Sequence, residues 1–413
     1  MHPVSRVTTG CDAVVVGGGL VGLAVARELA TTHRLRVLLV EREHRVAAHQ
    51  SGHNSGVVHS GLYYRPGSQK SRTCAAGREL LLAYAAERRI AHERCGKLVV
   101  ALTEDEVPRL EELERRGHAN GLAGVERLDA AGVRAAEPHA AGIAGLWVPE
   151  TGIIDYPAVA AAFAEDVATA GGEVRLGAGV TAIRHRGERL EIEAGGERIE
   201  TGLLVGCAGL ASDRIARLAG LRPEVRIVPF RGDYFELLPA ARQLVRNLIY
   251  PVPDPELPFL GVHLTRRIDG SVEAGPNAVL AWKREAYRAG AFSVRYAWST
   301  LAYPGFWRMA RRQVAVAGRE YRRAWSRSSF AAALARLVPE LAERDLRPAG
   351  CGVRAQAVDR QGKLVDDFVF AEAERMLHVL NAPSPAATAS MAIGKILAER
   401  AVAQLGATPA ASR

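Results

Sequence analysis

The feature that most constrains this chain is a strand–turn–helix–strand pattern in residues 12–41. Residues 12–16 (DAVVV) form a β-branched run typical of a buried parallel strand. GGGLVG follows at once, then a segment with apolar residues at helical spacing, then a second strand, RVLLV, which ends at Glu41. A glycine pattern alone is weak evidence. Placed between a strand and a helix, with an acidic residue about 20 positions on, it predicts a dinucleotide-binding βαβ unit.

Each part of this unit has a physical role. Gly17 permits the tight turn, Gly19 lets a pyrophosphate approach the backbone, and Gly22 lets helix and strand pack closely. The start of the helix offers free N–H groups and partial positive charge to the phosphates, and Glu41 can accept hydrogen bonds from ribose hydroxyls. We therefore predict cofactor contacts at Gly17, Gly19, Leu20, Gly22, Glu41 and Arg42.

Composition limits the class of protein. A chain of 413 residues is too long for one small core, so we expect two domains. No stretch approaches the roughly 18 consecutive apolar residues of a membrane span. The first 19 residues lack the cationic start, apolar run and cleavage site of a signal peptide. The five cysteines are scattered and odd in number, which indicates a reducing cytoplasm rather than a disulfide framework or a zinc site.

The net charge of +9 permits three kinds of partner, namely nucleic acid, an anionic membrane surface or an acidic small molecule. In residues 305–330 seven arginines accompany a single acidic residue, Glu320, and Trp307, Tyr321 and Trp325 are interleaved among them. At helical spacing this predicts a basic amphipathic helix that rests on anionic lipid, or a solvated arginine face whose aromatic rings pack inward. The sequence leaves both interpretations open.

Two later turns repeat the passage from a strand into a helix. VGCAG at 205–209 precedes helical LASDRIARLAG, and MLHVLNAPSPAATAS near the C-terminus passes through a Pro/Ser/Ala turn into the last helix. Backbone N–H groups at 381–387 would suit the electron-rich end of a reduced flavin. Three visits to one cofactor favour a long FAD over a compact NAD. The predicted contacts are Val180, Ala208, Gly209, Pro383, Ser384, Pro385, Ala386, Ala387 and Thr388.

Five stretches, together with the glycine unit, carry a family resemblance. They are GHNSGVVHSGLYYRPGS, PFRGDYFEL, LIYPVPDPELPFLGVHLTRRIDGSVEAGPNAVLAWKRE, GVRAQAV and NAPSPAATAS. With them the chain resembles the D-amino-acid oxidase superfamily and, within it, the L-2-hydroxyglutarate oxidase/dehydrogenase family. The resemblance implies an α/β fold in which a Rossmann-like FAD-binding domain carries an inserted antiparallel-sheet substrate-binding domain. It also implies FAD, a small dicarboxylate substrate, (S)-2-hydroxyglutarate, oxidised to 2-oxoglutarate, and electrons passed to a quinone or O2.

Residues 49–68 hold three histidines, for which a metal site, a surface loop and a loop over the cofactor compete. Two glycines break any helix that would hold the histidines rigidly, and no acidic residue completes a metal-binding set. Because the stretch follows the ribose-binding Glu41, we expect it to cross the pyrophosphate and the flavin ring, without a metal. The predicted contacts are His49, Gln50, Ser51, His53, Asn54 and Ser55.

Oxidation of a 2-hydroxy acid needs a base for the hydroxyl proton and cations for the carboxylates. His263, in an apparent strand, is the preferred base and His59 the second, although each could instead be a core histidine bound to a carbonyl. Guanidinium offers a carboxylate a planar fork of donors, and the resemblance implies that the region of Arg354 anchors a substrate carboxylate, so Arg354 is the preferred ligand. The catalytic set is completed by Tyr234, and further substrate contacts are predicted at Tyr63, Arg231 and Gln356.

We expect the FAD-binding domain to be discontinuous. Its predicted segments are 1–90, 150–222 and 346–405; the substrate-binding domain takes 91–149 and 223–345; and 406–413 form a flexible tail. Cys351 reads as a small buried hydrophobe, so the FAD is expected to be non-covalent. The expected location is the cytoplasm, with peripheral contact to the inner face of the cell membrane left open.

Two alternatives stay open. The same fold could act on another 2-hydroxy acid or an amino acid. A reading of a different class is a non-catalytic FAD protein that binds a membrane surface or RNA through residues 305–330. Because no RNA-binding module is recognisable and the aromatic residues form no stacking platform, nucleic acid is not an expected partner.

Overall fold

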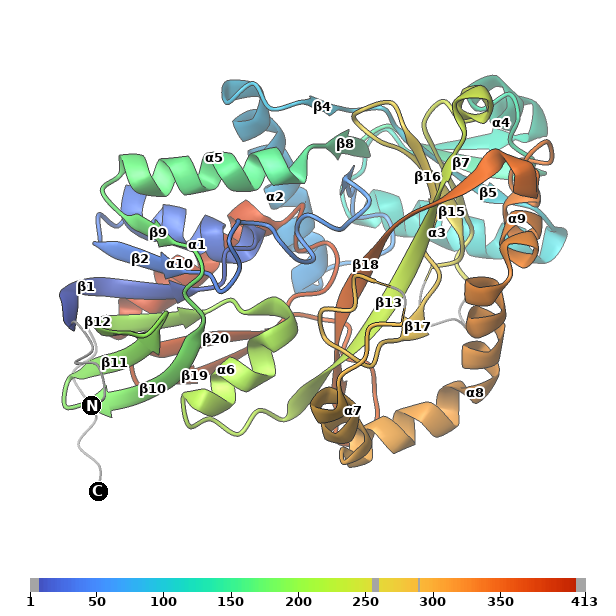
Figure 1. Cartoon of the computed structure of the whole chain (residues 1–413). Coiled ribbons are helices and arrows are strands. Elements are labelled where there is room, and N and C mark those ends of the chain that lie inside the picture. The colour runs from blue at the N-terminus through green and yellow to red at the C-terminus, as the bar shows by residue number, and fades with distance from the viewer. Residues whose placement is uncertain (1–6, 255–259, 289, 406–413) are drawn as a thin grey trace.

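The computed structural model describes residues 7–254, 260–288 and 290–405, with all their side chains except those of 7–9, 314–317 and 319–325. Two large sheets lie side by side along the molecule, and helices pack on both of them (Figure 1). The first sheet contains the N-terminal strands and the last two strands of the chain, and the second contains the strands between residues 225 and 359 together with segments from earlier in the chain.

The first sheet has eight strands and is built around the predicted βαβ unit. Strand β1 (Val7–Val16) runs parallel to β2 (Val37–Val40) on one side and to β12 (Glu197–Gly206) on the other. Helix α1 (Leu20–Thr31) connects β1 to β2, as the sequence predicts. The remaining strands are β9 (Glu173–Arg175), β10 (Val180–Arg186), β11 (Arg189–Ala194), β19 (Val369–Ala373) and β20 (Met376–Asn381).

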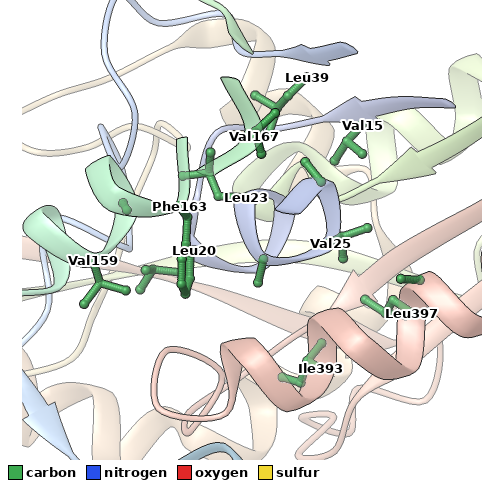
Figure 2. Packing of buried hydrophobic residues seen from close by; sticks show 14 of the residues in the cluster. Val15, Leu20, Leu23, Val25, Leu39, Val159, Phe163, Val167, Ile393 and Leu397 are labelled. Atoms are coloured by element: carbon green, nitrogen blue, oxygen red, sulfur yellow. The ribbon is translucent and has the colours of Figure 1, made fainter. Parts of the chain in front are cut away.

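Helices from three distant parts of the chain pack around α1. Both α5 (Tyr156–Thr169) and α10 (Ser390–Leu405) contact α1, and α2 (Gln69–Glu87) packs on α10. Figure 2 shows Leu23 of α1 in one buried cluster with Phe163 of α5 and Leu397 of α10. A Cβ atom on Gly394 would lie 2.8 Å from backbone atoms of Ala24, so α1 and α10 cross at close range. This packing fixes the position of the phosphate-binding end of α1.

The second sheet has nine strands and is largely antiparallel. Its longest pair joins β13 (Val225–Leu237) to β18 (Leu346–Asp359). The predicted hairpin is present, because β15 (His263–Arg266) pairs with β16 (Val272–Gly275) across a tight turn. The other strands are β5 (Lys97–Ala101), β6 (Glu126–Asp129), β7 (Ala144–Val148), β14 (Leu248–Pro251) and β17 (Val279–Leu280).

The pairing of β18 differs from the sequence-based assignment. The sequence places residues 346–359 with the FAD-binding segments, whereas in the structure they pair with β13 along their whole length. The domain borders stay a prediction, and this pairing favours a border after Asp359 over one at residue 346. The predicted tail, 406–413, lies outside the described residues.

Helices cover both faces of the second sheet. Side chains alternate along β5, so Leu98 and Val100 pack with α9 (Arg327–Ala335), while Val99 packs with α3 (Val107–Ala119) on the opposite face. The remaining helices are α4 (Ala130–Ala136), α6 (Ser212–Leu218), α7 (Val294–Leu301) and α8 (Pro304–Trp325). The short 3-10 turns are η1 (Glu104–Glu106), η2 (Gly209–Ala211), η3 (Pro239–Leu244) and η4 (Glu343–Asp345).

A small third sheet holds in place the end of residues 49–58, which we call the histidine-rich loop. It consists of β3 (Val57–Val58), β8 (Gly152–Ile154) and β4 (His92–Glu93), in that order. The hydroxyl of Tyr156, at the start of α5, also donates to the carbonyl of Val57 at 3.0 Å. Residues 49–58 are therefore tied to α5 at their far end.

Candidate active site

The turn between β1 and α1 accepts only glycine at two positions. Gly17 has a φ of +114°, and a Cβ atom there would lie 2.4 Å from the carbonyl oxygen of Cys207. A Cβ atom on Gly22 would lie 2.0 Å from the carbonyl oxygen of Gly17. The first turn of α1 carries no acidic residue. The backbone is thus kept open to an anion at the positive end of the helix, which is what a pyrophosphate requires.

Glu41 closes this turn from the end of β2. Its side chain is 9% exposed; Oε2 accepts the N–H of Gly18 at 2.6 Å and Oε1 accepts the N–H of Glu43 at 2.9 Å. Each carboxylate oxygen has a second lone pair, so these bonds leave acceptor capacity for a ribose hydroxyl. The geometry is compatible with the predicted role of Glu41.

The histidine-rich loop is held in shape by its own polar groups. Ser51 Oγ accepts the N–H of Leu20 at 3.0 Å, which links the loop to the start of α1. The side-chain amide of Asn54 donates to the carbonyl of Ser51 at 2.8 Å, and its oxygen accepts the N–H of Gly56 at 2.9 Å. Gln50 reaches across to the second sheet, where its side-chain oxygen accepts the N–H of Ala355 at 3.0 Å. The loop therefore bridges the two sheets.

A segment that the sequence did not assign to the site packs on this loop. Arg42 donates to Glu285 at 2.8 Å, and the ring of Tyr287 lies 4.3 Å from that of His53 and 5.8 Å from that of His49. Burial, followed by the charge of Arg42, lowers the pKa of His49. Over the described ranges no group of three or more His, Cys, Asp or Glu side chains is arranged to hold a metal ion.

The C-terminal turn supplies another wall of the site. Ser384 Oγ lies 3.3 Å from His59 Nε2 and 3.5 Å from the hydroxyl of Tyr64. Thr388, predicted to contact the cofactor, is fully buried instead and supports the turn from behind. Its hydroxyl accepts the N–H of His59 at 3.1 Å and lies 3.0 Å from the hydroxyl of Tyr156.

One cavity of about 1400 Å³ collects these elements. This volume exceeds the roughly 300–1,000 Å³ of ordinary ligand pockets, and leaves room for a dinucleotide and a small substrate. Of the predicted cofactor residues, those lining it are Gly17, Gly19, Leu20, Gly22, Glu41, Arg42, His49, Gln50, Ser51, His53, Asn54, Ser55, Val180, Ala208, Gly209, Pro383, Ser384, Pro385, Ala386 and Ala387. The predicted catalytic and substrate-contacting residues that line it are His59, Tyr63, Arg231, Tyr234, His263, Arg354 and Gln356.

His263 is the better placed of the two candidate bases. Its Nδ1 lies 2.8 Å from the carbonyl oxygen of Gly261, and a carbonyl only accepts, so Nδ1 carries the proton and Nε2 keeps a lone pair. Its ring packs on Tyr250 at 4.0 Å. Burial above all, with the charges of Lys97 and Arg354, lowers the pKa of His263 to about 4. The imidazole is therefore neutral at neutral pH.

His59 is held less specifically. Burial, with the charge of Lys97, lowers its pKa to about 3, and its Nε2 lies beside the hydroxyl of Ser384. A hydroxyl can donate or accept, so this contact does not determine the tautomer of the ring. His59 could accept a proton at Nε2 only if Ser384 released that atom.

The other predicted substrate ligands differ in the partners that their side chains already have within the protein. Arg231 is paired with Asp233, and the amide nitrogen of Gln356 donates to the carbonyl of Ala357 at 3.0 Å and to that of Val365 at 3.2 Å. Burial lowers the pKa of Arg354, yet a guanidinium starts so high that it keeps its charge. Burial raises the pKa of Tyr234, so its hydroxyl stays a hydrogen-bond donor.

Several residues at the site carry no recognisable motif. Tyr250 lines the cavity beside His263, while Glu285 and Tyr287 cover the loop at 42–53. The four residues of β14, Leu-Ile-Tyr-Pro, do not alternate between apolar and polar, so no local pattern indicates that Tyr250 faces the site. Nothing local to residues 284–287 indicates that they contact a loop more than 200 positions away in the sequence.

A match to a protein-family model identifies the family of this chain. A family model described as FAD dependent oxidoreductase matches residues 12–400. The chain belongs to this family. The match confirms the predicted fold class and FAD as the cofactor, and the chain is accordingly an oxidoreductase.

Relatives within the FAD-dependent oxidoreductase family are similar over nearly the whole chain. A protein from Indibacter alkaliphilus named L-2-hydroxyglutarate dehydrogenase is 44% identical over 95% of this chain and 98% of its own length. The human protein named L-2-hydroxyglutarate dehydrogenase, mitochondrial, is 43% identical over 96% of this chain and 89% of its own.

Solved structures share the fold. L-α-glycerophosphate oxidase from Mycoplasma pneumoniae superposes with a TM-score of 0.78 at 22% identity, covering 97% of this chain and 96% of its own. Glycine oxidase from Geobacillus kaustophilus superposes with a TM-score of 0.73 at 19% identity, covering 98% and 100%. At these identities the likeness supports the fold alone.

The predicted basic helix is present as α8, which ends at Trp325. Trp307 is 49% exposed, so it does not pack fully inward, whereas the side chains of Glu320, Tyr321 and Trp325 lie outside the described residues. Among the described helices none is long and apolar enough to cross a bilayer.

Proposed function

We propose that this enzyme oxidises L-2-hydroxyglutarate to 2-oxoglutarate with FAD. The observation that carries the proposal is the meeting, in one cavity, of the glycine turn, a neutral histidine whose Nε2 keeps a lone pair, and the guanidinium of Arg354. The choice of substrate is supported by the relatives at 42–44% identity, whose names specify L-2-hydroxyglutarate.

The residues around the glycine turn would hold the cofactor. The backbone at Gly17 to Leu20 would hold the pyrophosphate, Glu41 the ribose, and the turn at 383–387 the flavin. When bound, FAD supplies the acceptor for the hydride from C2 of the substrate. We propose that it is bound without a covalent link, since the buried thiol of Cys351 is engaged with the carbonyl of Ala286 at 3.7 Å.

His263 would take the hydroxyl proton through Nε2. With a pKa of about 4 it is neutral at pH 7 but a weak base, because burial and two cations oppose its protonation. The negative charges of a bound dicarboxylate would counteract those cations and raise this pKa toward neutrality. The base would therefore strengthen when the substrate is in place.

Arg354 would hold a substrate carboxylate, and the hydroxyl of Tyr234 would donate a further hydrogen bond to it. Both residues line the cavity, and the charge of Arg354 acts on both Tyr234 and His263. A guanidinium binds a carboxylate through two parallel N–H bonds, which fixes its orientation. Orientation of the carboxylate directs the C2 hydroxyl toward the base.

We propose a quinone or O2 as the final electron acceptor and a cytoplasmic location with peripheral contact at the membrane. The contact is supported by Val294, Trp298 and Trp307 of α7 and α8, which are 76%, 73% and 49% exposed. Apolar side chains beside arginines suit an anionic lipid surface.

The test is anaerobic mixing of the purified holoenzyme with L-2-hydroxyglutarate while the absorbance of oxidised flavin is followed. Rapid bleaching with the L form, and none with the D form or lactate, is the expected result. A flavin that stays oxidised with L-2-hydroxyglutarate but bleaches with another hydroxy or amino acid would refute the proposed substrate and keep the enzyme class.

A further inference from the structure

Lys97 is a buried cation beside the cavity that the proposed function does not use. It begins β5 and is 1% exposed. It shares a face of the strand with Val99, which packs on the same side as Tyr63 and Tyr250. Its Nζ lies 4.3 Å from the ring centre of Tyr63 and 5.2 Å from that of Tyr250. Both tyrosines line the cavity, so the ammonium sits directly behind its wall.

Within the described part of the chain, no anion balances this charge. Over the described residues no carboxylate pairs with Lys97, and the titratable groups that act on it or on which it acts are Cys74, His59 and His263, with the two tyrosine rings. Tyrosine faces attract a cation but replace only part of its lost hydration. Burial accordingly lowers the pKa of Lys97 to about 7. An unpaired buried cation of this kind is a site prepared for an anion that arrives from outside.

Two cations act on the candidate base from different strands. The charges of Lys97 on β5 and Arg354 on β18 both lower the pKa of His263, so each lies within electrostatic reach of that imidazole. A dicarboxylate whose hydroxyl meets His263 would bring two negative charges into the same space. One guanidinium cannot balance both charges, and Lys97 is a buried cation that has no carboxylate partner among the described residues.

We propose that Lys97 is the second cation of the substrate site and stabilises the carboxylate that Arg354 does not bind. The inference rests on the proposed function, because it takes the ligand to be a dicarboxylate. It explains why a strand inside the second sheet begins with a buried lysine, and it makes selection of a dicarboxylate over a monocarboxylate depend on a charge behind the two tyrosines.

The test uses the holoenzyme and glutarate, a dicarboxylate that has no hydroxyl group and so cannot be oxidised. Binding is followed by the change in the flavin absorption spectrum. Lys97→Met removes the charge and keeps the length of an unbranched side chain in an apolar setting. We expect it to weaken glutarate binding at least about 30-fold, the effect of removing one partner of a buried charge pair.

The matched control is Lys70→Met. Lys70 also lines the cavity and is buried, but its ammonium is already paired with Asp366 at 2.7 Å. We expect this variant to bind glutarate within about threefold of the unaltered enzyme. Equal weakening in the two variants would show a general effect of cavity charge and would overturn the assignment to Lys97.

The pH dependence of binding separates this role from a structural one. Lys97 loses its proton above pH 7 in the ligand-free site, and only the charged form attracts glutarate, so affinity should fall as the pH rises. The expected loss approaches tenfold per pH unit above about pH 7 and is absent in Lys97→Met. A fall in affinity above pH 7 that survives in Lys97→Met, or a variant that binds glutarate normally while only the pH profile of turnover shifts, would overturn the proposal.

These outcomes are distinct from failure of the proposed function. If L-2-hydroxyglutarate left the flavin oxidised while glutarate bound in a Lys97-dependent way, the substrate would be wrong and the dicarboxylate site would stand. If the flavin bleached normally and glutarate binding ignored Lys97, the oxidation would stand and the second cation would lie elsewhere.

Discussion

Replacement of Gly22 by alanine tests the architecture of the phosphate-binding turn. The added Cβ would lie 2.0 Å from the carbonyl oxygen of Gly17 and 3.2 Å from Cβ of Cys207. An ordinary contact between such atoms is about 3.4 Å or more, so the turn must move by more than about 1 Å. Overpacking of this kind costs about 1–3 kcal/mol. The displaced group is the backbone carbonyl of Gly17, in the turn that would face the pyrophosphate. We therefore expect the free-energy cost to weaken FAD binding.

The expected result is FAD binding weakened by a factor of about 5 to about 150, from 1.4 kcal/mol per tenfold change. The assay is titration of apo-protein with FAD, followed by quenching of flavin fluorescence, together with thermal unfolding of both apo-proteins. The control is Gly318→Ala on α8, where an added Cβ meets nothing within 4 Å; it should leave the FAD affinity unchanged. A Gly22→Ala protein that binds FAD as tightly as the unaltered chain would refute the reasoning.

Three further predictions concern charge and protonation. Arg354→Met should raise KM for L-2-hydroxyglutarate about 30-fold or more in steady-state assays, and an unchanged KM would exclude contact with the substrate. Arg284→Met leaves the fully buried Asp213 with Arg217 as its remaining partner and should cost about 1.5–3 kcal/mol of stability, seen as a lower Tm; an unchanged Tm would contradict this. Burial lowers the pKa of His378 to about 4, so the unfolded chain binds that proton first and stability falls as pH drops from about 6.5 to about 4. His378→Leu should remove about 3 kcal/mol of this acid sensitivity, measured as Tm against pH.

Much of the nucleotide end of the site could be predicted because its signals are local. The turn from β1 into α1, the glycines that it requires and Glu41 at the end of β2 all lie within 30 residues. The backbone conformation at Gly17 and the close packing at Gly22 both require glycine, and this requirement can be recognised from a short segment of sequence alone. The later turns at 205–209 and 381–387 were recognisable for the same reason.

The substrate end depended on contacts that no segment shows alone. His263 and Arg354 could be nominated by chemical type, but only the sheet brings β15 and β18 to one cavity. From the sequence Arg231 ranked behind Arg354, but its pairing with Asp233 became visible only in the structure. Thr388 looked like a wall residue, but the fold placed it behind the turn.

By itself, then, the sequence determined the βαβ unit, the class of cofactor and the kinds of side chain available for the chemistry. Tertiary structure decided which of those side chains share a cavity, and what charge each one meets there. Lys97 illustrates the difference most clearly. In the sequence it is one lysine at the start of an apolar run; in the fold it is a cation between two tyrosine rings, with no carboxylate to balance it among the described residues. Burial and charge pairing are set by distant strands, so no local pattern can report them.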